Sequence, residues 1–66
     1  YRATISTDLP ITRGADIYLN NKSCGSIVDY HQINFNQYQL HVIAQASDVE
    51  TGAITMDPEK KYFLIF

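Results

Sequence analysis

The sequence predicts an all-β protein, a small antiparallel β-sandwich of about seven short strands. Three observations predict this fold class. No segment keeps an apolar period of 3.6 residues, β-branched and aromatic residues dominate the apolar positions, and turn residues separate short alternating runs. A chain of 66 residues makes at most one domain, so residues 1–66 are treated as a single module.

The first half of the chain contains three alternating runs, which predict strands over residues 1–6, 15–19 and 23–28. A loop over residues 7–14 connects the first two runs. Asparagine tolerates a positive φ, so Asn20 and Asn21 predict a two-residue hairpin turn. Gly25 predicts a bulge or a close backbone approach in the returning strand.

The second half contains four more runs, which predict strands over residues 31–35, 38–45, 50–56 and 62–66. Asn36 and Gln37 predict a turn between the first two of these strands. Proline at the second position of the sequence D-P-E-K predicts a type I turn over residues 57–60.

The chain is short for a protein that must stabilise itself. A single core below ~70–80 residues seldom supplies more than about 3–5 kcal/mol. Cys24 is the sole cysteine in the sequence, which excludes an internal disulfide, and two histidines with one cysteine make a poor metal set. We therefore expect flanking or partner strands to complete the sheet and to contribute stability.

The C-terminal run consists of five apolar residues, Tyr62, Phe63, Leu64, Ile65 and Phe66. An unpaired apolar strand is an aggregation hazard, so this run predicts a central strand or a partner-binding strand. At a sheet edge, its backbone would suit strand addition by a partner. The same run predicts that the chain is a fragment of a longer protein.

The charge pattern bears on the class of partner. The formal net charge is −2, and the five basic residues are scattered along the chain, whereas a nucleic-acid-binding domain carries a clustered basic surface. Nucleic acid is therefore not expected as a partner. No apolar run reaches the ~18–20 residues that span a bilayer, so membrane attachment is expected only through an anchor upstream of residue 1.

The stretch G-A-D-I-Y-L-N-N-K-S-C-G over residues 14–25 resembles a hairpin of the form D-V-Y-L-N-G-K-x-x-G. This hairpin occurs in small bacterial envelope lipoproteins of one domain-of-unknown-function family. The segments at residues 1–2, 38–43, 53–57 and 61–64 follow that family's order at similar spacing. The hairpin is also similar to that of the PEGA domain, an extracytoplasmic β-module. Asn21 stands at the position of the usual turn glycine, and a second expected glycine is replaced at residues 37–39.

The resemblance implies an exported β-sandwich in the periplasm or at the outer membrane, with an accessory role. The function predicted from it is a non-enzymatic structural subunit of a bacterial cell-envelope assembly, for example a secretion-system outer-membrane complex. Its partners would be other protein subunits of that assembly. The alternative is a PEGA-like module that binds a ligand or a carbohydrate. Neither family supplies catalytic residues.

The sequence contains residue types for a thiol nucleophile, a base and an orienting acid in Cys24, Asp29, His31 and His41. By strand parity, however, His31 shares the apolar face of its strand with Ile33 and Phe35. His41 falls on the polar face of the next strand, so the two imidazoles are expected to point in opposite directions. We therefore predict no catalytic site, no metal site and no cofactor.

Polar and aromatic residues gather on one face of the predicted sheet. This face could bind a ligand through aromatic and amide groups. The competing interpretation is an ordinary solvated face, since antiparallel sheets commonly expose one polar side. The possible ligand face consists of Tyr18, Gln39, His41 and Gln45.

Overall fold

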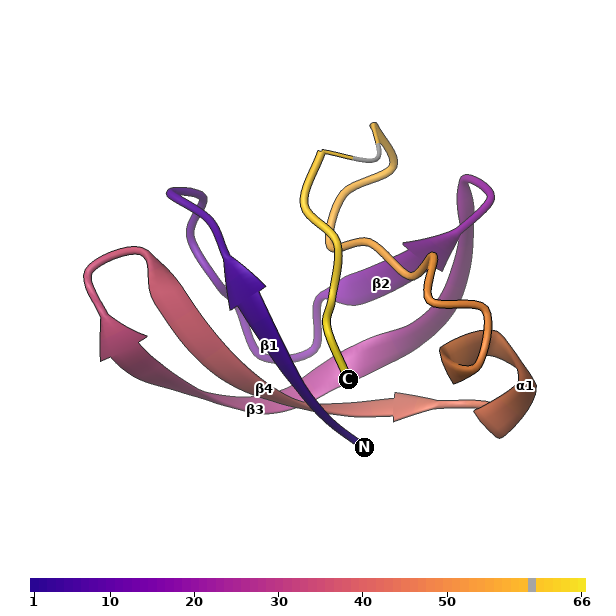
Figure 1. Ribbon diagram of the computed structural model, residues 1–66, viewed down its shortest axis with the longest axis horizontal. Helices are drawn as coiled ribbons and strands as arrows, with labels where there is room; N and C mark the ends of the chain where they lie inside the picture. The colour runs from indigo at the N-terminus through magenta and orange to yellow at the C-terminus, as the bar shows by residue number, and fades with distance from the viewer. Residues whose placement is uncertain (60) are drawn as a thin grey trace.

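A computed structural model describes residues 1–59 and 61–66 of the chain. It contains one curled antiparallel sheet with the strand order β1-β4-β3-β2 and one short helix (Figure 1). The elements are β1 (Arg2–Ser6), β2 (Asp16–Leu19), β3 (Lys22–Asn34), β4 (Gln37–Ala44) and α1 (Ala46–Val49). The predicted all-β class is confirmed, whereas the predicted seven-stranded sandwich is not found.

The hairpin between β2 and β3 forms at the predicted position. Asn20 and Asn21 have φ values of 53° and 65°. This left-handed geometry at both central residues matches the right-handed twist of the two strands, and asparagine adopts it at lower cost than most residues.

Strand β3 is a single strand of 13 residues where the sequence predicts two, over 23–28 and 31–35. Its pairing with β4 continues through Asp29 and Tyr30, with register shifts between Ile27 and Asp29 and between Gln32 and Asn34. Each shift inserts one extra residue, which interrupts the two-residue alternation without ending the strand. The first shift lies beside residues 29 and 30, where the interrupted alternation predicted a connection.

Gly25 confirms the prediction of a close backbone approach. A Cβ atom built at this position would overlap the backbone carbonyl of Ile43 on β4. The register between β2 and β3 also shifts next to it, between Ile17 and Tyr18. Glycine is required here because β3 lies against backbone, which cannot move aside as a flexible side chain would.

The predicted strand over residues 50–56 is largely wrong. Residues 46–49 form α1, and a turn follows in which the Thr51 hydroxyl donates a hydrogen bond to the Asp48 carbonyl at 2.6 Å. Gly52 then takes a φ of 68°, which reverses the chain direction. Thr55 alone forms a bridge, so extended pairing is confined to the end of the predicted strand.

Two short segments close the curled sheet into a ring. Thr55 and Tyr18 exchange backbone hydrogen bonds of 2.8 and 2.9 Å, which joins residues 54–56 to β2. The Leu64 N–H then donates to the Ile54 carbonyl at 2.9 Å. Figure 1 shows the C-terminal segment crossing the open side of the sheet.

The ring closes at β1, where Thr4 and Ile65 exchange hydrogen bonds of 2.8 and 2.9 Å. The predicted strand over residues 62–66 is therefore reduced to isolated bridges at Phe63 and Ile65. In the turn before it, the Asp57 carboxylate accepts hydrogen bonds from the N–H groups of Lys61 and Tyr62. Lys60, the last residue of the predicted turn, lies outside the described residues.

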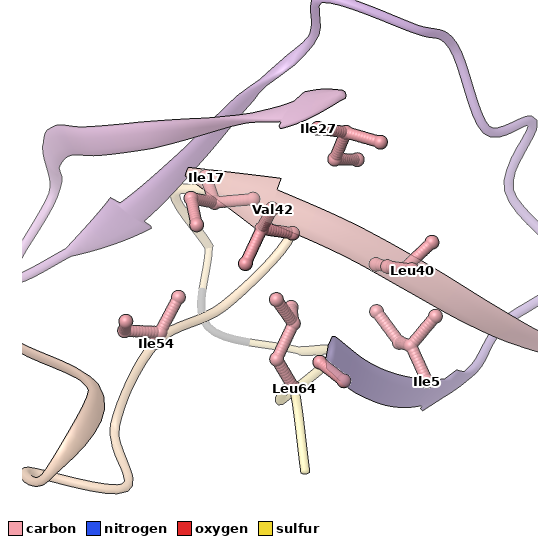
Figure 2. Packing of buried hydrophobic residues seen from close by; sticks show 8 residues of the cluster. Ile5, Ile17, Ile27, Leu40, Val42, Ile54 and Leu64 are labelled. Carbon is pink, nitrogen blue, oxygen red and sulfur yellow. The ribbon is translucent and has the colours of Figure 1, made fainter. Parts of the chain in front are cut away.

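The core lies inside this ring and consists of aliphatic side chains (Figure 2). Six of its members come from the sheet, and Ile54 and Leu64 come from the closing segments. The eight core residues are Ala3, Ile5, Ile17, Ile27, Leu40, Val42, Ile54 and Leu64.

Replacement of Gly25 tests the close approach of β3 to β4. In Gly25→Ala the added methyl group meets the Ile43 carbonyl, so the variant should lose about 1–3 kcal/mol of stability through overpacking. In a domain of this size that loss lowers Tm by roughly 4–8 °C per kcal/mol. Thermal denaturation checks it, with Ser23→Ala on the exposed part of the same strand as control. Equal Tm values for the two variants would contradict the close approach.

Candidate functional site

Two histidines lie on the same outer face of the β3–β4 hairpin. The strand register places Asp29 opposite His41, and His31 opposite Gln39. These four residues, together with Tyr30, line a surface hollow of about 250 Å³, which we call the histidine hollow. The prediction that the two imidazoles point in opposite directions is therefore wrong.

The error has a physical cause in the way β3 leaves the core. The parity argument assigned His31 to a buried face because Ile33 and Phe35 are apolar. Past Ile27, however, β3 extends beyond the closed ring, and Ile33 and Phe35 are 52% and 86% exposed. Apolar identity therefore does not mark the core face in this part of the strand.

Asp29 is the most strongly held charge of this hollow. Its Oδ1 accepts hydrogen bonds from the Tyr30 N–H at 2.9 Å and from Arg13 Nε at 3.0 Å. The Tyr30 N–H and then the Arg13 charge lower the pKa of this carboxyl group below its ordinary value. The Arg13 guanidinium also lies 5.9 Å from the centre of the Tyr30 ring. The pair is exposed, so it orients these side chains more than it stabilises the fold.

The predicted ligand face is divided between different parts of the surface. Gln39 and His41 lie together in the histidine hollow. Gln45 lines a second hollow of about 450 Å³ at the opposite end of β4. Tyr18 is half-buried on β2 and belongs to the lining of neither hollow. The structure thus brings together two of the four predicted residues, and adds Asp29, Tyr30 and His31 to them.

Cys24 is a half-buried free thiol in the second hollow, which it shares with Gln45 and Asp48. Burial raises the pKa of this thiol, and the nearby Asp48 carboxylate raises it further. Both effects favour the protonated thiol, which is a poor nucleophile. Cys24 and the histidines line separate hollows, so the structure does not bring the thiol to an imidazole.

The predicted partner-binding residues, Tyr62–Phe66, differ from one another in their environments. The Leu64 N–H and both backbone groups of Ile65 are used in closing the ring, so the segment is not a free edge in the described structure. Leu64 is buried in the core. The Tyr62 hydroxyl donates a hydrogen bond to Asp8 at 3.0 Å, and this bond is the main cause that raises the pKa of Tyr62.

The other three side chains of this segment are exposed. Phe63 is 47% and Ile65 is 70% exposed, and Phe66 packs edge-to-face on Tyr1 with a centroid separation of 6.3 Å. We call Tyr1, Phe63, Ile65 and Phe66 the closing-segment surface. Strand addition at this segment would require breaking the ring, whereas contact through these side chains would not.

A second exposed apolar set was missed by the sequence analysis. It lies on the part of β3 beyond the ring and on the turn that follows, and it comprises Val28, Tyr30, Ile33 and Phe35. The sequence indicates this exposure through the polar residues that interrupt the apolar set, which are Asp29, His31, Gln32 and Asn34. A buried strand would not tolerate so many polar side chains.

Within residues 1–59 and 61–66, no group of three or more histidine, cysteine or acidic side chains is placed to hold a metal ion. None of the helical structure described in this range is long and apolar enough to cross a membrane. Comparison of the chain with protein-family models, curated proteins and solved structures finds no match. The family resemblance at residues 14–25 thus stays a prediction.

The environment of Cys24 predicts slow alkylation of the native protein. At neutral pH, iodoacetamide should modify the native thiol more slowly than the urea-unfolded chain, because a raised pKa reduces the thiolate fraction. Asp48→Asn removes a nearby negative charge and should accelerate the reaction, whereas Glu50→Gln, outside the Cys24 hollow, should not. Mass spectrometry over a pH series measures the rates. Faster reaction of the native protein would contradict this assignment.

Proposed function

We propose that the protein is a non-enzymatic structural subunit of a bacterial cell-envelope assembly, and that it docks on other subunits through the closing-segment surface. One observation carries the proposal. Ten large hydrophobic side chains are exposed in the described structure, against eight apolar residues in the core. Four of the ten make up the closing-segment surface, in which Phe66 and Tyr1 bring the two chain ends into contact.

Three of these exposed side chains, Phe63, Ile65 and Phe66, lie on one short segment, and Phe66 packs edge-to-face on the fourth, Tyr1. Single exposed hydrophobic side chains are common, but contiguous ones mark interaction sites. Burying one such side chain against a partner is worth roughly 1.5–3 kcal/mol. Aromatic residues are also enriched at the centres of interfaces, and Tyr1, Phe63 and Phe66 supply them here.

The small core supports the same proposal, because a small core leaves the isolated chain with limited stability. Eight aliphatic residues make a modest interior, and short chains bury a low fraction of their surface. A partner that covers Ile65 and Phe66 would add to the apolar area removed from water. The location in the cell envelope rests on the resemblance of residues 14–25 to the lipoprotein hairpin.

Site-specific photo-crosslinking in the native cell tests the docking surface. A photoreactive amino acid at Ile65 should give adducts with another envelope protein, because this side chain is 70% exposed on the proposed surface. The same amino acid at Thr51, exposed in the turn after α1, is the matched control and should give none. Cell fractionation should recover the adduct with the envelope. Equal adduct yields at the two positions, or recovery from the cytoplasm, would refute the proposal.

The histidine hollow supports a second candidate, a ligand-binding module. The observation that favours it is the convergence of Asp29, Tyr30, His31, Gln39 and His41 around about 250 Å³. Carboxylate, imidazole and amide groups suit a small polyhydroxylated ligand.

Titration with a panel of disaccharides tests this candidate. The amide signals of Gln39 and His41 should shift in NMR spectra. His41→Ala should abolish the shifts and leave the fold intact, because this side chain is exposed. Gln45→Ala, in the other hollow, is the control and should leave them unchanged. Shifts that persist in His41→Ala would exclude the hollow as the site.

A further inference from the structure

The part of β3 beyond the ring has one open edge. Strand β2 pairs with β3 only as far as Ser26, and the backbone of Gly14 and Ala15 then covers Ile27. From Asp29 to Asn34, β3 pairs with β4 alone (Figure 1). The open edge therefore arises because β3 has 13 residues and β2 has four.

The hydrogen bonds of β4 show which backbone groups face this edge. Val42 exchanges two hydrogen bonds of 2.8 Å with Tyr1, so its backbone faces β1. Alternation along an antiparallel strand then directs His41 and Gln39 towards β3. Asp29 and His31 are opposite these two residues and bond to β4. Tyr30 and Gln32 consequently direct their N–H and C=O groups away from β4, into the open edge.

One of these outward backbone groups already has a hydrogen-bond partner, and the others do not. The Tyr30 N–H donates to the Asp29 carboxylate, which Arg13 holds in place. Among residues 1–59 and 61–66, the Tyr30 carbonyl and both backbone groups of Gln32 have no backbone partner outside the β3–β4 pairing. A strand edge with free groups is a template for another strand, and the Asp29 carboxylate protects one position of it.

We infer that this edge pairs antiparallel with the same edge of a second copy of the chain, about a two-fold axis at His31. In this register Tyr30 of each copy lies opposite Gln32 of the other. The Gln32 N–H of each copy donates to the Tyr30 carbonyl of the other, and the Gln32 carbonyl replaces the Asp29 carboxylate as the acceptor of the Tyr30 N–H. An antiparallel pair of identical edges is isologous and therefore closes as a dimer.

Charge supports a second copy as the occupant. The edge from residue 28 to residue 35 carries one formal charge, Asp29, which is already neutralised by Arg13. Two identical edges therefore meet without like-charge repulsion, and an oppositely charged peptide would find no free charge to bind. The antiparallel arrangement also brings the highly exposed Phe35 of each copy towards Val28 of the other.

The dimer uses a different surface from the closing segment, so it does not rest on the proposed function. Light scattering after size exclusion, with the purified chain at about 100 μM, populates any dimer of micromolar Kd. The measured mass should be twice the 7.5 kDa of the chain. A monomer at this concentration would overturn the inference whatever the result of cross-linking at Ile65.

Proline at Gln32 tests the role of the edge backbone. Gln32→Pro removes an N–H that faces away from β4, a position where edge strands tolerate proline. Two hydrogen bonds are lost across the axis, so Kd should rise by roughly tenfold or more. Gln32→Ala keeps the N–H and should keep the dimer. A dimer equally stable in both variants, with their folds confirmed by circular dichroism, would overturn the proposed pairing.

A disulfide test reports the register directly. In a Cys24→Ser background, His31→Cys places two thiols opposite each other on the axis, where Cα atoms of a non-hydrogen-bonded pair are about 4.5 Å apart. Mild oxidation should then give a covalent dimer on a non-reducing gel. Thr51→Cys in the same background is the exposed control and should give no covalent dimer. Equal cross-linking of the two variants would overturn the register.

Discussion

The hydrogen-bonded pair between Thr4 and Ile65 holds the two ends of the chain together, and the fold depends on it. It fixes the C-terminal segment across the open side of the curled sheet, which brings Leu64 beside Ile54 and the six core residues of the sheet. Without this closure the concave face of the sheet would lie open to water. A sheet of four strands with one apolar face must cover that face, and this chain does so with its own C-terminal residues.

Closure also decides which groups remain available at the surface. The Leu64 N–H and both backbone groups of Ile65 form hydrogen bonds within the ring, so Phe63, Ile65 and Phe66 present side chains and not a free strand edge. Strand β3 shows the reverse situation. It continues past the end of β2, and both its apolar side chains and part of its backbone stay exposed. The two apolar surfaces thus offer different kinds of contact, one through side chains and one through strand pairing.

The polar groups of the molecule are divided in a similar way by the register of β3 and β4. Asp29, His31 and His41 gather at one hollow, and Cys24 lies with Asp48 at another. The thiol is held protonated by burial and by a carboxylate, and the carboxylate in the histidine hollow is held by Arg13. The two hollows are therefore lined by separate sets of residues.

Local patterns in the sequence determined the elements whose causes are themselves local. The asparagine pair specified the β2–β3 turn through its tolerance of positive φ, Gly25 specified the close approach, and alternation specified β1, β2 and β4. Tertiary structure alone decided the continuity of β3, the face of His31 and the closure by residues 54–56 and 62–65. These features depend on bulges and on pairings between residues up to 61 positions apart, as for Thr4 and Ile65, and no local alternation encodes them.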